Sequence, residues 1–185
     1  WYPGEQGGNA LARILFGEVN PSGRLPVTFY RSTTDLPPFD DYSMQGRTYR
    51  YFGGEAAFSF GYGLSYSTFE YANAKLISPE PDNMSITLEV KNNGPLDGHE
   101  VVQVYYRQQA SGVGRQAEDP LQSLIGIKKI FIPAGETVEV KVPLSVDFMK
   151  RWDAAKQEYV LLPGNHEFRI GASSGDIRIR LEGRF

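Results

Sequence analysis

The sequence predicts a mixed fold, in which the C-terminal end of an alternating α/β domain precedes an all-β sandwich. Near the start of the chain, apolar residues recur at helical spacing and are followed by a strand-like alternation. From Phe69 onward, apolar residues alternate with a period of two, and turn residues interrupt them at short intervals. The chain is 41% hydrophobic and 13% aromatic, which is sufficient for a globular core.

The first predicted elements are a turn and a helix. The segment PGEQGG is typical of a tight turn, because glycine adopts positive φ without steric cost. The segment ALARILF follows it and places Leu11, Ile14 and Leu15 on one helical face. Gly17 predicts the C-terminal stop of this helix.

A second turn and a strand come next. The segment VNPSG at 19–23 predicts the turn, and LPVTFY after it alternates Leu25, Val27 and Phe29 on one face. That alternation predicts a half-buried strand. The succession of turn, helix, turn and strand is typical of the tail of an alternating α/β domain.

Residues 31–54 are predicted to form a long loop, and loops of this length are often functional. The loop combines carboxylates, guanidinium groups and flat rings, the mixture that sugar-binding sites use: Asp40, Asp41, Tyr42, Arg47, Tyr49 and Arg50. Two adjacent aspartates point in different directions and do not make the facing pair of carboxylates that glycoside hydrolysis needs. Ion pairs of these aspartates with Arg47 or Arg50 in a domain interface are therefore the favoured interpretation.

The segment FSFGYGLSYSTFEY at 58–71 gathers aromatic rings around Gly61 and Gly63, where the character of the sequence changes. Large rings dominate interface energetics and glycine lets backbones approach closely, so this segment is predicted to join two domains.

Short alternating segments separated by turns fill the rest of the chain. The predicted strands are SITLEVKN, EVVQVYYR, SLIGIKKIFI, TVEVKVPL, HEFRIGAS and DIRIRLEGRF, with a hairpin around AAKQ in 150–161. Six or seven short strands with regular turns indicate a sandwich of immunoglobulin or fibronectin type III topology. No Cys-Trp-Cys pattern is present, which favours the fibronectin type III-like variant.

Composition and charge exclude several classes of function. The net charge of −3 lacks the basic excess of a nucleic-acid-binding protein, and no apolar run reaches the length of a membrane span. The absence of cysteine excludes disulfides and thiolate chemistry but leaves periplasmic, secreted and cytoplasmic locations open. Asn83-Met84-Ser85 matches a glycosylation acceptor, a pattern that arises easily by chance.

Isolated side chains suggest few sites. His99 and His166 lack a second ligand at metal-binding spacing, so no metal is expected and both are predicted to be surface or half-buried strand residues. Four aromatic residues of the sandwich either stack on sugars or serve core packing: Tyr105, Tyr106, Trp152 and Tyr159. Glu5 lies in a turn at a helix N-terminus, where it either caps the helix or faces a ligand crevice.

Three long segments carry a family resemblance. WYPGEQGGNALARILFGEVNPSGRLPVTFY, DLPPFDDYSMQGRTYRYF and FSFGYGLSYSTFEY together resemble the C-terminal part of family 3 glycoside hydrolases. The segments PLQSLIGIKKIFIPAGET and PGNHEFRIGASSGDIR are similar to the fibronectin type III-like domain of that family. The second of the three long segments is most similar to the bacterial β-xylosidase branch, with β-glucosidases as close relatives.

The resemblance implies a domain division and an activity. Residues 1–65 would be the C-terminal portion of an α/β sandwich domain, including the long loop, and residues 66–185 a fibronectin type III-like domain. The whole enzyme would be a retaining exo-glycosidase that removes terminal β-linked xylose or glucose from oligosaccharides without a cofactor. Its N-terminal catalytic barrel and the remainder of the α/β domain would be the partners of this chain, and a homodimer is left open. The alternative is a stand-alone carbohydrate-binding or subunit-interface module without catalysis.

The resemblance also limits which catalytic groups this chain can supply. The nucleophile of the family is an Asp in an S-D-W motif, which this sequence lacks, and the acid/base Glu is expected upstream of Trp1. In some relatives the acid lies in the P-G-x-E-G turn, where this chain has Gln6 with Glu5 beside it. Glu5 is therefore the catalytic candidate, and Glu5, Gln6, Tyr42 and Arg47 are the substrate-binding candidates. The chain is expected to be part of a longer protein and to be inactive by itself.

Overall fold

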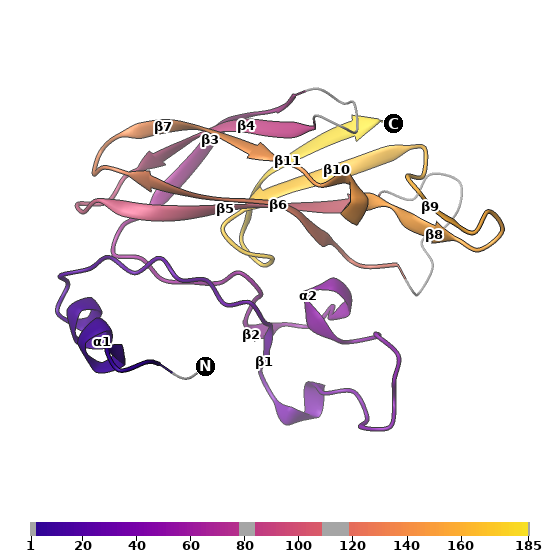
Figure 1. Ribbon diagram of the computed structural model, residues 1–185, viewed down its shortest axis with the longest axis horizontal. Helices are drawn as coiled ribbons and strands as arrows, with labels where there is room; N and C mark the ends of the chain where they lie inside the picture. Colours follow the sequence, from indigo (N-terminus) through magenta and orange to yellow (C-terminus); the bar gives the residue numbers. More distant parts are fainter. Residues whose placement is uncertain (1–2, 78–83, 109–118, 185) are drawn as a thin grey trace.

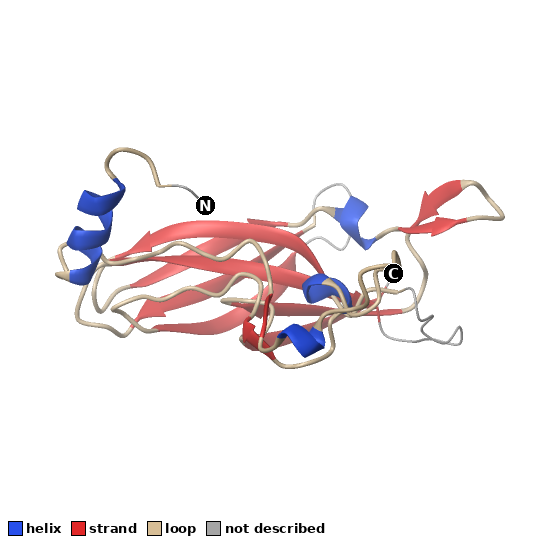
Figure 2. Ribbon diagram, turned by 90° about the horizontal axis from the view of Figure 1, so that it is seen from below, coloured by secondary structure: helices blue, strands red, loops and turns tan. Residues whose placement is uncertain are grey.

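The computed structural model describes residues 3–77, 84–108 and 119–184. Within these ranges, seven strands form two packed antiparallel sheets (Figures 1 and 2), with the orders β11-β10-β5-β6 and β3-β4-β7. The strands are β3 (Phe69–Ile77), β4 (Ser85–Asn92), β5 (Gly98–Gln108), β6 (Ser123–Ile132), β7 (Thr137–Pro143), β10 (Asn165–Gly171) and β11 (Ile177–Arg184). The predicted fibronectin type III-like sandwich is confirmed, since six of the predicted segments coincide with strands.

Alternation along the strands produces the core between the two sheets. On β4, Ile86, Leu88 and Val90 are all less than 2% exposed, and the register places them opposite valines of β7. Successive residues of a strand point to opposite faces of the sheet. An apolar side chain at every second position of β4 and β7 is therefore enough to fill the space between the two sheets. The glycosylation acceptor predicted at Asn83-Met84-Ser85 has its asparagine outside the described residues.

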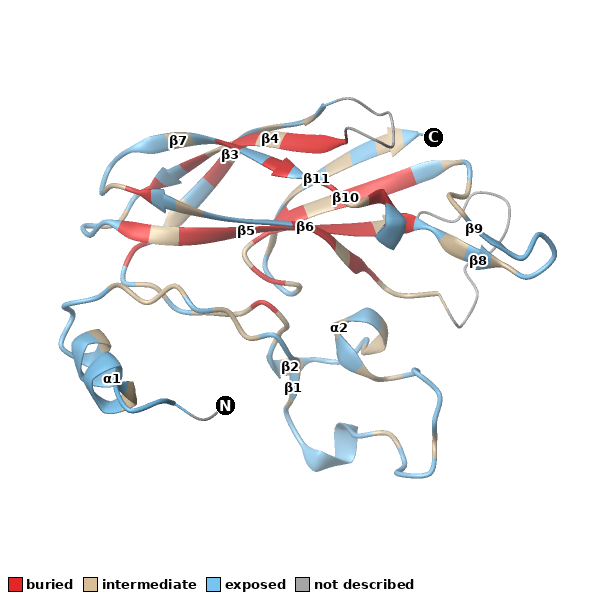
Figure 3. Cartoon of the chain, in the orientation of Figure 1, coloured by how far each residue is buried: buried red, intermediate tan, exposed pale blue. Residues whose placement is uncertain are grey.

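The central strand β5 is buried on both faces, as Figure 3 shows. Val102 and Val104 face the other sheet and are fully buried in the core. Gln103 and Tyr105 point to the opposite face, where they are also at most 1% exposed. The residues that cover this second face come from the N-terminal third of the chain, which runs along the four-stranded sheet (Figure 1).

The N-terminal third contains only short elements: α1 (Gly7–Leu15), β1 (Phe29–Tyr30), η1 (Thr33–Asp35), α2 (Thr48–Tyr51) and β2 (Ala56–Phe58). The predicted helix is confirmed, and Gly17 ends it with a φ of +78°. The predicted strand at 25–30 is shorter than expected, since only Phe29 and Tyr30 pair, with β2. On the predicted face, Leu25 is half-buried, whereas Val27 and Phe29 are 40% and 46% exposed, and the Phe29 ring meets that of Phe58 edge to face with centroids 6.1 Å apart.

A hairpin extends from one end of the sandwich (Figure 2). It consists of β8 (Arg151–Asp153) and β9 (Glu158–Val160), preceded by η3 (Val146–Met149). Trp152 pairs with Tyr159, so the predicted hairpin around AAKQ is confirmed. No helix in the described part of the chain is long and apolar enough to cross a membrane.

Candidate functional site

The turn before α1 presents Glu5 and Gln6 to solvent. The backbone amide of Gly7 donates to the Gly4 carbonyl at 2.9 Å, which closes the turn, and Gln6 is the N-cap residue of the helix. The Gln6 side chain accepts a hydrogen bond of 2.5 Å from Asn9, whereas the Glu5 carboxylate makes no hydrogen bond or ion pair with any described residue. Glu5 therefore does not cap the helix, and its side chain is exposed to solvent in the part of the chain that the structure describes.

The loop that contains Tyr42 and Arg47 is held together from within. The Arg47 guanidinium donates to the carbonyl oxygens of Ser43 at 3.0 Å and Asp41 at 2.5 Å. Tyr42 is 92% exposed at the surface of the loop. Arg47 is therefore a structural clamp for the loop that displays Tyr42.

The predicted ion pairs of the adjacent aspartates are not formed among the described residues. Asp41 instead accepts the backbone amide of Ser43 at 2.8 Å, an Asx turn. This backbone hydrogen bond, more than the Ser43 hydroxyl or the charge of Arg47, lowers the pKa of the exposed Asp41 carboxyl. Arg50 lies over the ring of Tyr51, 5.6 Å from its centroid. The neighbouring Ser43 satisfies the Asp41 carboxylate locally, which is the physical reason that Asp41 does not need the predicted ion pair.

The two groups of candidate residues do not converge. Figures 1 and 2 both show α1, which follows Glu5 and Gln6, well separated from the loop of Tyr42 and Arg47. No closed site is formed from these four side chains alone. Each group is displayed on the surface of the N-terminal third, where the exposed apolar residues also gather: Leu11, Leu15, Phe16, Val27, Phe29, Leu36, Phe39, Met44, Phe58 and Leu64.

A buried ionic cluster joins the N-terminal third to the sandwich, and the sequence analysis did not identify it. Arg24 donates to Glu100 at 3.0 Å, and their side chains are only 10% and 2% exposed. Tyr71 donates to the other carboxylate oxygen at 2.8 Å. Burial, and then the charge of Glu100, raises the pKa of the Tyr71 hydroxyl, so it stays protonated as a donor. These residues are up to 76 positions apart, which local patterns do not reveal.

Asn20 and Gln103 complete the contact between the two parts of the chain. The Asn20 side chain accepts from the Tyr66 amide at 2.9 Å and donates to the Asp97 carbonyl at 3.0 Å. Gln103 donates to the Gly61 carbonyl at 3.1 Å and accepts from Tyr105 at 2.6 Å. The segment at 58–71 thus joins the two parts, as predicted, by polar contacts as well as by its rings.

The histidines differ from each other in burial. His99 on β5 is half-buried beside the ring of Phe131, as predicted. His166 on β10 is fully buried, contrary to the prediction, and its Nδ1 is 2.9 Å from the Tyr106 hydroxyl. Burial lowers the pKa of His166, and a hydrogen bond to the Leu162 backbone opposes that effect. No cluster of metal-ligating side chains occurs in the described ranges.

The four aromatic residues of the sandwich divide into two pairs. Tyr105 and Tyr106 are 0% and 7% exposed, so they serve packing and are closed to a sugar. Trp152 and Tyr159 on the hairpin are 47% and 66% exposed and pack edge to face at 5.2 Å. Only this second pair is accessible for stacking.

Comparison with known proteins assigns both parts of the chain. The model of the glycosyl hydrolase family 3 C-terminal domain matches residues 1–66, and that of the fibronectin type III-like domain matches residues 100–174. The chain belongs to the C-terminal region of glycosyl hydrolase family 3. The resemblance inferred from the sequence motifs is thereby confirmed.

Individual relatives of this family 3 chain agree with the assignment. A xylan 1,4-beta-xylosidase of Xylanibacter ruminicola is 42% identical over 95% of the chain and 20% of its own length. A periplasmic beta-glucosidase of Salmonella typhimurium is 33% identical over 96% of the chain and 25% of its own length. The solved structure of beta-glucosidase 3B from Thermotoga neapolitana, in complex with alpha-D-glucose, matches with a TM-score of 0.85 and 31% identity over 100% of this chain and 27% of its own. The family 3 chain thus spans about a quarter or less of these two curated relatives.

Proposed function

We propose that this family 3 chain works as the C-terminal region of a retaining exo-glycosidase that hydrolyses terminal β-linked xylose or glucose. The observation that carries the proposal is the match of nearly the whole chain to a xylan 1,4-beta-xylosidase, at 42% identity. Several other relatives are named beta-glucosidases, and these names support glucose as the alternative to xylose. A carbohydrate-binding module without catalysis is less well supported, since the relatives carry enzyme names.

We also propose a division of labour within such an enzyme. Residues 66–185 brace the assembly, and residues 1–65 complete the α/β domain with the exposed apolar side chains of α1 and of the loop 31–54. Apolar patches of this kind on a small chain mark interaction surfaces. The partner surface is the upstream catalytic region, which supplies both reacting carboxylates about 5 Å apart.

In this assembly, Glu5, Gln6 and Tyr42 contribute to the rim of the substrate site, and Arg47 positions Tyr42 through its loop. The exposure of Glu5 and Tyr42 supports the proposal, because neither side chain makes a hydrogen bond or ion pair with another residue that the structure describes. Among these four, Glu5 alone carries a carboxylate, so its substitution tests whether this chain, and not the upstream region, supplies the acid/base.

A chimera tests the proposed function. In it, this chain replaces the matching region of the Xylanibacter ruminicola xylan 1,4-beta-xylosidase, and the same enzyme truncated before that region is the control. We expect the chimera to hydrolyse an aryl xyloside or aryl glucoside, and the isolated chain and the truncated enzyme to be inactive. Robust turnover by the isolated chain would refute the proposal, as would a folded chimera that hydrolyses neither substrate.

Two substitutions in the chimera test the rim. Tyr42→Ala is expected to raise KM several-fold with kcat nearly unchanged, the pattern of lost ground-state binding. Glu5→Gln is expected to lower kcat less than 10-fold, because Glu5 is proposed to line the rim and not to act as the general acid. Loss of a general acid commonly lowers the rate by about 10²–10⁴-fold. A loss of that larger size would instead make Glu5 the acid/base.

A further inference from the structure

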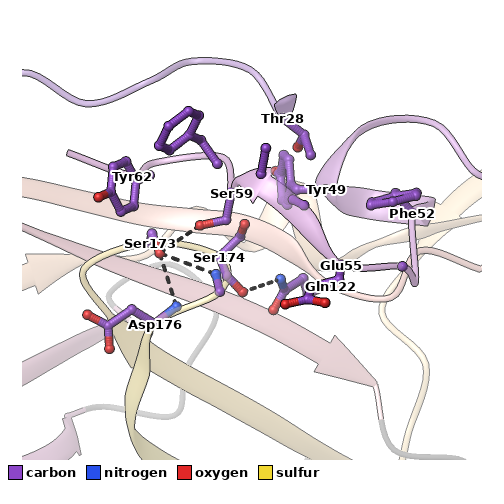
Figure 4. Close-up of a pocket in the computed structure, with 15 residues that line it drawn as sticks. Thr28, Tyr49, Phe52, Glu55, Ser59, Tyr62, Gln122, Ser173, Ser174 and Asp176 are labelled. Atoms are coloured by element: carbon purple, nitrogen blue, oxygen red, sulfur yellow. Dashed lines mark hydrogen bonds between the residues drawn. The ribbon is translucent and has the colours of Figure 1, made fainter. Parts of the chain in front are cut away.

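An open pocket of about 470 Å³ lies where the N-terminal third meets the sandwich. Figure 4 shows Tyr49, Phe52 and Tyr62 on one side of it, and Ser173, Ser174 and Asp176 on the other. The first group comes from the segment 49–62, and the second from the turn between β10 and β11. The volume falls within the range of sites for small molecules.

The aromatic side of the pocket is fixed in place. Tyr49 stacks on Phe60 with ring centroids 4.2 Å apart, and its hydroxyl accepts the Leu124 amide at 3.0 Å. Phe58 and Tyr62 form a second ring pair at 5.2 Å. Because these rings are already held in place by neighbouring rings, they offer flat apolar surfaces to a ligand and lose little conformational entropy when it binds.

The polar side is equally well fixed. The Ser173 hydroxyl is hydrogen-bonded to Ser59 at 3.0 Å and accepts the Asp176 amide at 3.0 Å. Gln122 donates to the Ser174 carbonyl at 2.9 Å and accepts from Arg169 at 3.3 Å. The hydroxyls, amide and carboxylate along this side are therefore arranged before a ligand arrives.

Both carboxylates that line the pocket are paired with arginines. Glu55 forms an ion pair with Arg31, and Asp176 lies 2.9 Å from Arg178. With their charge compensated, these groups act as hydrogen-bond acceptors and exert little net attraction on a cation or an anion. The lining thus matches a neutral ligand that carries many hydroxyl groups and one apolar face.

We propose that this pocket binds a mono- or disaccharide as a second carbohydrate site, separate from the rim residues Glu5 and Tyr42. Sugar hydroxyls would meet Ser59, Ser174 and the two carboxylates, behind which Ser173 and Gln122 hold the turn in place, and a C–H face of the sugar would rest on the rings. No reaction is proposed at this site, and sugar binding by the chain and turnover by the chimera are separate measurements, so either proposal can fail without the other.

Titration of the chain with xylobiose and with cellobiose, followed by amide NMR, tests the site. We expect saturable shifts at Ser174 and Gly175, with a Kd in roughly the millimolar range. Ala57→Trp fills the pocket from an exposed position on β2 and is expected to weaken binding at least about tenfold. Ala134→Trp adds the same ring in an exposed turn outside the pocket and is expected to bind as the unaltered chain does.

Three outcomes would overturn the proposal: no saturable shift with either disaccharide, unchanged affinity in a folded Ala57→Trp chain, or shifts confined to the hairpin around Trp152. Tighter binding of glucuronate or glucosamine than of glucose would overturn the neutral ligand class. If the Ala57→Trp chain does not fold, the shifts in the unaltered chain test the proposal by themselves: shifts at Ser174 and Gly175 support the pocket, and their absence there overturns it.

Discussion

At the scale of single residues, the buried pair of Arg24 and Glu100 has the largest expected effect on stability. Glu100→Gln leaves the Arg24 charge buried without its partner, and breaking such a pair costs about 3–5 kcal/mol. We expect this loss in the free energy of unfolding by urea. Glu18→Gln, which removes the exposed pair with Arg13, should cost less than about 0.5 kcal/mol. Similar values for the two variants would contradict a buried, unscreened pair.

His166 makes a second residue-scale prediction, about pH. Its pKa is lowered in the folded chain, so below its ordinary value of 6.5 the unfolded chain binds more protons. The contribution of neutral His166 to the free energy of unfolding is thus present above pH 6.5 and is lost as the pH falls below 6.5. Urea unfolding at pH 7.5, 6.5 and 5.5 should show this decline, and His166→Gln should flatten it. An unchanged slope in the His166→Gln chain would argue against burial of this histidine as the cause.

At the scale of elements, the segment at 58–71 depends on a close approach at Gly61. This residue has a φ of +82°, and a Cβ there would lie 2.0 Å from the Gln103 side chain. Gly61→Ala should therefore cost the strain of positive φ, about 1 kcal/mol, plus roughly 1–3 kcal/mol for displaced hydrogen bonds. Gly135 has a φ of +79° with open space around it, so Gly135→Ala should show the strain alone. Thermal unfolding of both variants measures the difference, and equal costs would contradict the close approach.

At the scale of the whole molecule, the two parts of the chain are expected to differ in autonomy. The core cluster consists of residues from Phe69 onward, whereas Gly61 is the one buried residue among the described residues 3–65. A chain of residues 66–185 should therefore fold cooperatively, with a lowered melting temperature because Tyr105 and Glu100 lose their cover. Residues 1–65 alone should give no cooperative transition. Calorimetry of the two pieces measures this, and a molten 66–185 piece would show that the sandwich requires its neighbour.

Local sequence patterns were enough to predict the elements whose cause is local. Alternation specified β4 and β7, helical spacing and Gly17 specified α1, and the motifs at the start of the chain indicated the family. The depth of His166, the clamp formed by Arg47 and the salt bridge between Arg24 and Glu100 were decided only by the tertiary structure. Each of these features depends on contacts that form only when the chain is packed. In each, a polar or charged group has either a partner far away in the sequence or a choice between several nearby partners. A periodic pattern records which way a side chain points, but not what it meets there.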